Sequence, residues 1–233
     1  MAPVELLRLA VEDNIGWCGV MCRAHGSDEF SSSALWANLE ASPPYYPNII
    51  TRQAGAQANV DALILGAETL RLTTGWGVKD SFCDLALSDH GFTDVVSAEW
   101  YGGIVEPGGI RSDWKMIESP EQLRCWETAW GGGEERLFLD CLLSDRRIRF
   151  WFQGEAGSIE AGFISFESGA TIGISNWFSL DQKPIAQIGG LQAACSVSPE
   201  RPLVCWSSDD SMNGSGLSRL GPLKVWIKTA GQY

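Results

Sequence analysis

Residues 147–178 read RIRFWFQGEAGSIEAGFISFESGATIGISNWF, and they constrain the fold more than any other part of the chain. Three runs rich in β-branched and aromatic residues are separated here by Gly-containing turns. In the first run Ile148, Phe150 and Phe152 fall on one face, at the period of two that a strand requires. The stretch therefore predicts an antiparallel meander of three strands that ends on the sequence Ser-Asn-Trp-Phe.

Outside the meander, helix-like and strand-like segments alternate along the chain. Apolar residues spaced three and four apart predict helices over residues 4–25, 54–65, 120–130, 136–143 and 184–196. Alternating runs predict strands over residues 45–51, 76–82, 91–103, 202–208 and 221–228. The clearest helix start is Ser119, a hydroxyl N-cap followed by Pro120 at the first helical position and Gln122 at the capping-box position.

Composition narrows the classes of partner and compartment. The 233 residues carry a formal net charge of −12, so we expect no nucleic-acid partner, because a phosphate backbone would be repelled. The seven cysteines are dispersed and form no CxxC pair, which favours reduced thiols in a cytoplasmic protein. No basic segment is followed by a long apolar run, so neither a signal peptide nor a membrane span is predicted.

Several motifs resemble the Gcn5-related N-acetyltransferase (GNAT) superfamily, and more narrowly an uncharacterised bacterial group of GNAT-like proteins. In the C-terminal half they are SPEQLRCWETAW (119–130), IEAGFISFESGATIGISNWF (159–178) and LSRLGPLKVWIK (217–228). The N-terminal half fits the same group through WCGVMCRAHG (17–26), PPYYPNIIT (43–51) and VKDSFCDLALSDHGF (78–92). The resemblance implies an α+β fold whose mixed, largely antiparallel sheet is flanked by helices.

The resemblance also implies how the chain is organised. The sequence EPGGIRSD (106–113) combines Pro, Gly and charged residues and is the best linker in the chain. We therefore expect an N-terminal GNAT-like half over 1–108 and a C-terminal GNAT-like domain over 109–233. Whether the two halves are pseudo-repeats of one another is left open.

The implied activity is acetyl transfer from acetyl-CoA to a small-molecule amine. In the superfamily, the loop that binds pyrophosphate reads Arg or Gln, two residues, Gly, one residue, then Gly or Ala. Gln187 and Gly190 match it here, Gly189 lies between them, and Gln192 stands where Gly or Ala is usual. Backbone N–H groups at a helix start favour an anion, so Gln187, Gly189 and Gly190 are the expected cofactor contacts.

Acetyl transfer needs a base for the ammonium proton and donors at the thioester oxygen. We expect Ser175 and Asn176 to face the acyl group at a split in the sheet, and Glu160 to be the base. Period two places Trp177 on the core, against the helix that begins at Ser119, and Asn176 on the other face with Phe178. The alternative is that Asn176 only caps its strand and Glu160 is a solvated edge carboxylate.

A second function, of a different class, stays open. The superfamily's frequent tyrosine acid has no match in residues 212–220, so a catalytically silent GNAT-like module that binds a small molecule or a protein is the alternative. We expect no membrane partner, and a homodimer is left open. Asp209 and Asp210 are expected to form a turn, although amine recognition is the competing interpretation.

One helical face carries soft ligands. Cys18, Cys22 and His25 follow one another at i, i+4 and i+7. Such a face can bind a metal, but buried thiols also pack as small apolar groups. Packing is the preferred interpretation, and no metal site is predicted.

Overall fold

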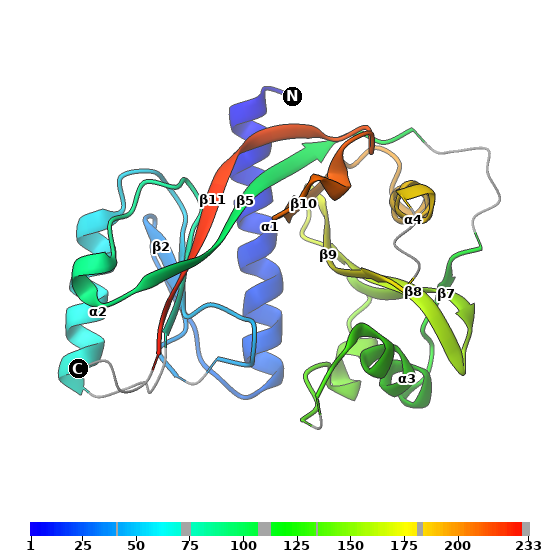
Figure 1. The fold of residues 1–233 in the computed structure, drawn as a ribbon, viewed down its shortest axis with the longest axis horizontal. Coiled ribbons are helices and arrows are strands. Elements are labelled where there is room, and N and C mark those ends of the chain that lie inside the picture. Colours follow the sequence, from blue (N-terminus) through cyan, green and yellow to red (C-terminus); the bar gives the residue numbers. More distant parts are fainter. Residues whose placement is uncertain (41, 71–75, 107–112, 134, 181–183, 230–233) are drawn as a thin grey trace. The chain divides into compact units, whose positions relative to one another are not determined.

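The computed structural model describes residues 1–40, 42–70, 76–106, 113–133, 135–180 and 184–229. Two compact units are found, Met1–Trp100 with Leu220–Tyr233 and, between these segments, Tyr101–Arg219 (Figure 1). Each combines α-helices with a mixed sheet, so the predicted α+β class is confirmed. The expected boundary at 108/109 falls in the linker, of which residues 107–112 lie outside the described part, and it stays a prediction.

The first unit builds a sheet in the order β1-β2-β3-β4-β11-β5. Its strands are β1 (Phe30–Ser31), β2 (Leu35–Ala37), β3 (Ile49–Thr51), β4 (Trp76–Asp80), β5 (Thr93–Gly103) and β11 (Ser218–Lys228). Two helices, α1 (Pro3–Ala24) and α2 (Gln57–Leu70), belong to the same unit. β3 and β4 run parallel and are connected through α2, whereas β11 runs antiparallel to β4.

The second unit builds a sheet in the order β10-β9-β8-β7-β6. Its strands are β6 (Lys115–Met116), β7 (Ile148–Glu155), β8 (Ser158–Glu167), β9 (Ile172–Ser179) and β10 (Leu203–Ser207). Helix α3 (Pro120–Trp130) and helix α4 (Pro184–Val197) both contact β8 and β9, and Figure 1 shows them on opposite faces of the meander. Both faces of β7 to β9 are therefore covered, which explains why Trp151 is buried although it alternates with Phe150 and Phe152.

The antiparallel meander expected over 148–178 is confirmed as β7, β8 and β9. The predicted start of α3 is confirmed as well: Ser119 Oγ accepts a hydrogen bond from the Gln122 amide at 3.3 Å. Gly131 ends the helix in the left-handed region, with φ at 95°, which a residue with a Cβ adopts only under strain.

Two local predictions were wrong. The helix expected over 136–143 is a short 3₁₀ turn, η2 (Asp140–Ser144), because the Leu137 and Phe138 amides donate to the buried Glu127 carboxylate rather than to helix carbonyls. The strand expected over 45–51 is reduced to β3, since Tyr45 has φ at 71° and turns the chain before Ile49.

Each unit contains one parallel strand–helix–strand segment, β3-α2-β4 in the first and β9-α4-β10 in the second. In the first unit Thr51 Oγ1 accepts from the Ser81 amide and Asn48 Oδ1 accepts from the Gly77 amide, so both ends of the β3–β4 pair are joined. The relation between the halves as pseudo-repeats stays a prediction.

Candidate functional site

The last third of β9 is interrupted by a β-bulge at Asn176. Ser175 of β9 pairs with Ile164 of β8, and Phe178 pairs with Gly162. Between these two pairs, Asn176 and Trp177 of β9 lie opposite only one residue of β8, Phe163. Asn176 has φ at 52°, in the left-handed region that Asn tolerates better than most residues. A bulge leaves one residue unpaired and redirects the side chains that follow it.

The bulge is flanked by aromatic rings on both faces of the sheet. Trp177 stacks on Phe163, with ring centroids 5.2 Å apart, and lies 5.4 Å from Trp114. Phe178 stands edge-on to Trp126 of α3 at 5.2 Å. Trp177 and Phe178 thus lie on opposite faces as expected, but the prediction that Trp177 packs on α3 was wrong.

The absence of a side chain at Gly162 explains why Phe178, and not Trp177, lies on the α3 face of the sheet. A Cβ at Gly162 would lie 2.4 Å from both the Phe178 ring and the Trp126 indole nitrogen. The glycine therefore makes room for Phe178 on the α3 face, and its strand neighbour Trp177 takes the other face.

The parallel pairing of β9 with β10 ends before the bulge. It joins Ile172 to Leu203 and Gly173 to Val204, whereas β9 continues to Ser179 and β10 continues to Ser207. Ser175 and Asn176 are both partly exposed, and neither side chain forms a hydrogen bond with the described residues. The backbone of β9 next to the bulge is thus left without a parallel neighbour.

The two predicted glycines lie inside α4 rather than at its start. The helix begins at Pro184, so the amides of Gly189 and Gly190 follow the first four and bond within the helix. A Cβ at Gly190 would lie 2.7 Å from two ring atoms of Trp177, and one at Gly189 would lie 3.5 Å from Trp114 Nε1. Both glycines let the helix approach the indole rings, and a role in pyrophosphate binding stays a prediction.

Gln187 directs its side chain into the protein. The residue is 5% exposed, and its Nε2 donates to Met212 Sδ at 3.6 Å. Gln187 is the fourth residue of α4, and the fourth residues of α1 and α3, Leu6 and Leu123, donate their amides to the residue before the helix. The Gln187 side chain is thus used inside the protein, and a role of this residue in pyrophosphate binding stays a prediction.

Glu160 is not brought together with Ser175 and Asn176. It lies at the exposed start of β8, where its carbonyl accepts from the Leu180 amide at 2.9 Å. Asn176 is opposite the middle of β8, beside Phe163. Three residues along a strand span about 10 Å, so direct proton transfer between Glu160 and an amine at Asn176 is not possible.

The turn after β10 is formed as expected. Asp209 Oδ1 accepts from the Ser211 amide at 2.9 Å and from Ser207 Oγ at 2.7 Å, and these hydrogen bonds lower the pKa of the Asp209 carboxyl. Asp210 accepts from Arg219 and from Asn213. Both carboxylates already serve the turn, and amine recognition by them stays untested.

The Cys18, Cys22 and His25 face of α1 is mostly buried. Burial raises the pKa of the Cys18 thiol to about 12, and Cys22 Sγ accepts from Asn38 Nδ2 at 3.3 Å. His25 caps the helix through its backbone. Among the described residues, no group of three or more His, Cys, Asp or Glu could hold a metal ion.

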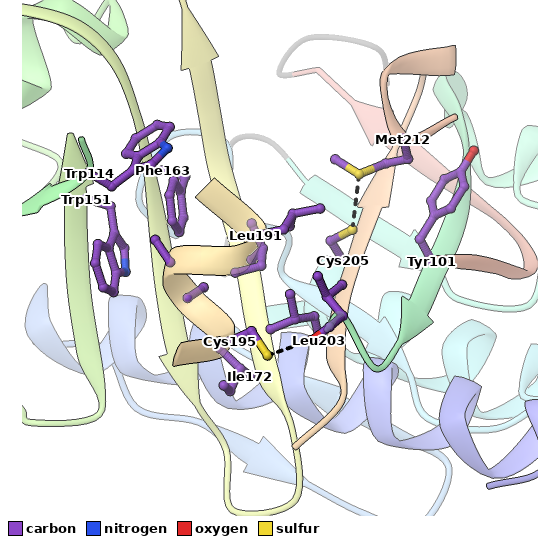
Figure 2. Packing of buried hydrophobic residues seen from close by; sticks show 14 of the residues in the cluster. Tyr101, Trp114, Trp151, Phe163, Ile172, Leu191, Cys195, Leu203, Cys205 and Met212 are labelled. Atoms are coloured by element: carbon purple, nitrogen blue, oxygen red, sulfur yellow. Dashed lines mark hydrogen bonds between the residues drawn. The ribbon is translucent and has the colours of Figure 1, made fainter. Parts of the chain in front are cut away.

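Sequence reasoning missed a sulfur-containing group in the core of the second unit. Met212 and Cys205 face each other there, and the Cys205 thiol donates to Met212 Sδ at 3.8 Å (Figure 2). The cluster also includes Ile172, Leu191 and Leu203. The one sequence signal for this group is that Met212 is an apolar residue within an otherwise polar turn sequence.

Known protein families give no sequence match: no family model fits the chain, and no curated protein matches it. Across the described helices, none is long and apolar enough to cross a membrane.

Solved structures do match. A functionally unknown conserved protein from Staphylococcus epidermidis has a TM-score of 0.61 at 14% identity, covering 88% of this chain and 94% of its own. A GCN5-related N-acetyltransferase from Kribbella flavida also has a TM-score of 0.61, at 10% identity, covering 97% and 96%. A GCN5-related N-acetyltransferase from Sphaerobacter thermophilus has a TM-score of 0.57 at 11% identity, covering 84% and 76%. The chain therefore has a GNAT-like fold.

Proposed function

We propose that this protein is an acyl-CoA-dependent N-acyltransferase that transfers an acetyl group to a small-molecule amine. The observation that carries the proposal is the bulge at Asn176, placed where the β9–β10 pairing has ended, in a GNAT-like fold. A bulged strand offers backbone donors that the ladder does not use. Such donors suit an acyl carbonyl, whose oxygen gains negative charge during transfer.

Acetyl-CoA would supply the activated acyl group, as a thioester. The residues present fit it at two places. The bulge around Ser175 and Asn176 would hold the acyl carbonyl, and the N-terminal end of α4, which carries Gln187, would hold the pyrophosphate. Gly189 and Gly190 contribute by allowing α4 to lie close to β9.

The ammonium proton of the acceptor must leave before the nitrogen can attack. In this proposal Glu160 receives it through intervening water, since the distance along β8 excludes direct contact. The acidic net charge of −12 favours a cationic acceptor such as a protonated amine, because it attracts cations.

A catalytically silent binding module remains the second candidate. It is favoured by the inward-facing Gln187 side chain, whose contact with Met212 fills space beside the start of α4. A module of this kind would bind its ligand without turnover.

The test is a thermal-shift titration with acetyl-CoA, CoA and, as a control, ADP, which shares the adenosine and the pyrophosphate of CoA but lacks the pantetheine arm and its thiol. A ligand that binds only the folded state stabilises it by about 2.7 kcal/mol at a concentration of 100 times Kd. We expect acetyl-CoA to raise the Tm more than ADP does, and thiol release to follow when a panel of polyamines and amino acids is added. No stabilisation by either CoA compound would contradict the proposal, and stabilisation without any thiol release would favour the binding module.

A further inference from the structure

Met212 is a buried side chain in a turn whose other residues face solvent. It ends the 3₁₀ turn η3 (Asp210–Met212) and is only 5% exposed, whereas Asp210, Ser211 and Asn213 are exposed. An apolar side chain that points inward from a polar turn indicates that the turn exists partly to place it.

The thioether of Met212 lies against the first residue of β10 beyond the parallel ladder. That residue is Cys205, whose Sγ is 3.8 Å from Met212 Sδ, and the pairing with β9 ends at Val204 (Figure 2). On its other side the thioether accepts from Gln187 Nε2 of α4 at 3.6 Å. Met212 therefore joins α4 to β10 at the point where β10 leaves β9.

The turn holds Met212 in place by its own hydrogen bonds. Asp209 Oδ1 accepts from the Ser211 amide at 2.9 Å, and the Asn213 amide donates to the Asp210 carbonyl at 2.9 Å. The Ser215 amide donates to the Met212 carbonyl at 3.2 Å. The backbone of residue 212 is thus fixed, while its long side chain packs in the apolar cluster and makes only weak sulfur hydrogen bonds, to Gln187 and Cys205.

Methionine suits this position chemically. Its unbranched, polarizable side chain fills irregular apolar space and adapts its conformation at low cost. The bulge of β9, where the acyl group is placed in the proposed function, and the Met212 contact on β10 both follow the last paired residues of the same two strands. An acyl chain longer than acetyl, extending from the bulge toward β10, would meet Met212.

We propose that Met212 is a specificity-determining residue that restricts the acyl donor to short acyl groups, acetyl rather than butyryl. This inference rests on the proposed acyltransferase function. A hydrophobic pocket discriminates one methylene by about 10- to 200-fold, so two added methylenes should be rejected strongly.

Calorimetric titration of the full chain with acetyl-CoA, butyryl-CoA and free CoA tests the inference. For the unchanged protein we expect acetyl-CoA to bind at least about tenfold more tightly than butyryl-CoA. Met212→Ala should reduce that ratio at least about tenfold and leave the affinity for free CoA unchanged. Met116→Ala is the matched control, because Met116 is 45% exposed on β6 and should keep the original ratio.

The results of these titrations distinguish a failure of the Met212 inference from a failure of the proposed acyltransferase function. If no CoA compound binds the unchanged protein, both the proposed function and the inference are overturned. If the CoA compounds bind but Met212→Ala keeps the original ratio, or if the unchanged protein already binds both thioesters equally, the inference alone is overturned. Should the alanine variant fail to fold, Met212→Val replaces it. We expect this variant to reduce the ratio of acetyl-CoA to butyryl-CoA affinity by about threefold. An unchanged ratio in Met212→Val would likewise overturn the inference.

Discussion

At the scale of single residues, the left-handed backbone of Asn176 should make the effect of a substitution on stability depend on which residue replaces it. With φ at 52° an alanine there is strained by about 1 kcal/mol, whereas glycine is not. We expect Asn176→Ala to lower the free energy of unfolding by about 1 kcal/mol, and Asn176→Gly to change it by less than about 0.5 kcal/mol. Urea unfolding of the two variants measures this difference.

The same pair of variants separates two roles for position 176 in the proposed site. If the side-chain amide contacts the ligand, both variants lose affinity for acetyl-CoA per folded molecule. If only the backbone of the bulge contacts it, Asn176→Gly retains the affinity. Equal stabilities for Ala and Gly would show that the left-handed conformation is absent in solution.

Lys79 is a buried cation in the first unit, remote in sequence from the proposed site. Its Nζ donates to Asn14 Oδ1 at 2.9 Å and lies 5.9 Å from the centroid of the Trp100 ring. Burial lowers the pKa of Lys79 to about 8 from its ordinary value of 10.5. Below pH 8 the folded protein must therefore keep a desolvated charge, and this destabilises it.

We expect Lys79→Met to be more stable than the unchanged protein at pH 7, by about 2 kcal/mol after loss of the Asn14 hydrogen bond. Between pH 8 and 10.5 the unfolded chain binds more protons at Lys79 than the folded chain does, so stability of the unchanged protein rises and the difference shrinks. Burial also raises the pKa values of Cys22 and Tyr46, which acts in the opposite direction but is common to both proteins. Burial raises the pKa of Cys18 to about 12 although the Lys79 charge lowers it, so in Lys79→Met the pKa of Cys18 rises further. Unfolding at pH 7 and at pH 10 measures the difference, and a variant less stable at pH 7 would contradict the account.

At the scale of elements, the two adjacent glycines of α4 should respond in opposite directions to the same substitution. A Cβ at Gly190 meets Trp177 ring atoms at 2.7 Å and Phe163 at 3.0 Å, so Gly190→Ala should destabilise the protein by about 1–3 kcal/mol. A Cβ at Gly189 meets Trp114 only at ordinary contact distance, 3.5 Å. Gly189→Ala should therefore stabilise the helix by up to about 1 kcal/mol. Thermal unfolding of both variants is the measurement, and the opposite order of stabilities would mean that α4 does not lie against these rings.

Local signals in the sequence explain which elements were predictable. The period of two in β7 to β9 and the Ser119 cap of α3 are both encoded within a few residues, and both predictions are confirmed. The bulge at Asn176 was not predictable, because its positive φ depends on the register with β8. The inward orientation of Gln187 likewise depends on Met212, which is distant in sequence.

At the scale of the whole chain, sequence order and spatial order differ most for the last strand. The motif at 217–228 was assigned to the C-terminal domain because it follows the other C-terminal elements, yet β11 lies between β4 and β5 of the first unit. Alternation in a single strand predicts that it has two faces but not which strands will be its neighbours. Long-range pairing of this kind is set by the assembled sheet.

The position of β11 leads to a prediction about truncation. A strand between two neighbours uses both of its edges, and β11 pairs with β4 from Lys224, opposite Asp80, to Lys228, opposite Trp76. It also buries the side chains of Leu223 and Trp226. A chain that ends at residue 217 would therefore expose the edges of two strands and lose part of the core of the first unit.

We expect the chain ending at residue 217 to lose the cooperative unfolding of the first unit, and the chain ending at residue 229, which keeps β11, to unfold like the full protein. Hydrogen exchange of the β4 amides is the direct measurement: protection should be lost in the shorter chain and retained in the longer one. A fragment of residues 1–108 should behave like the shorter chain, because it too lacks β11. If β4 stays protected in both shortened proteins, the first unit is complete without its C-terminal strand, and the boundary expected from the sequence is the better description of how the chain folds.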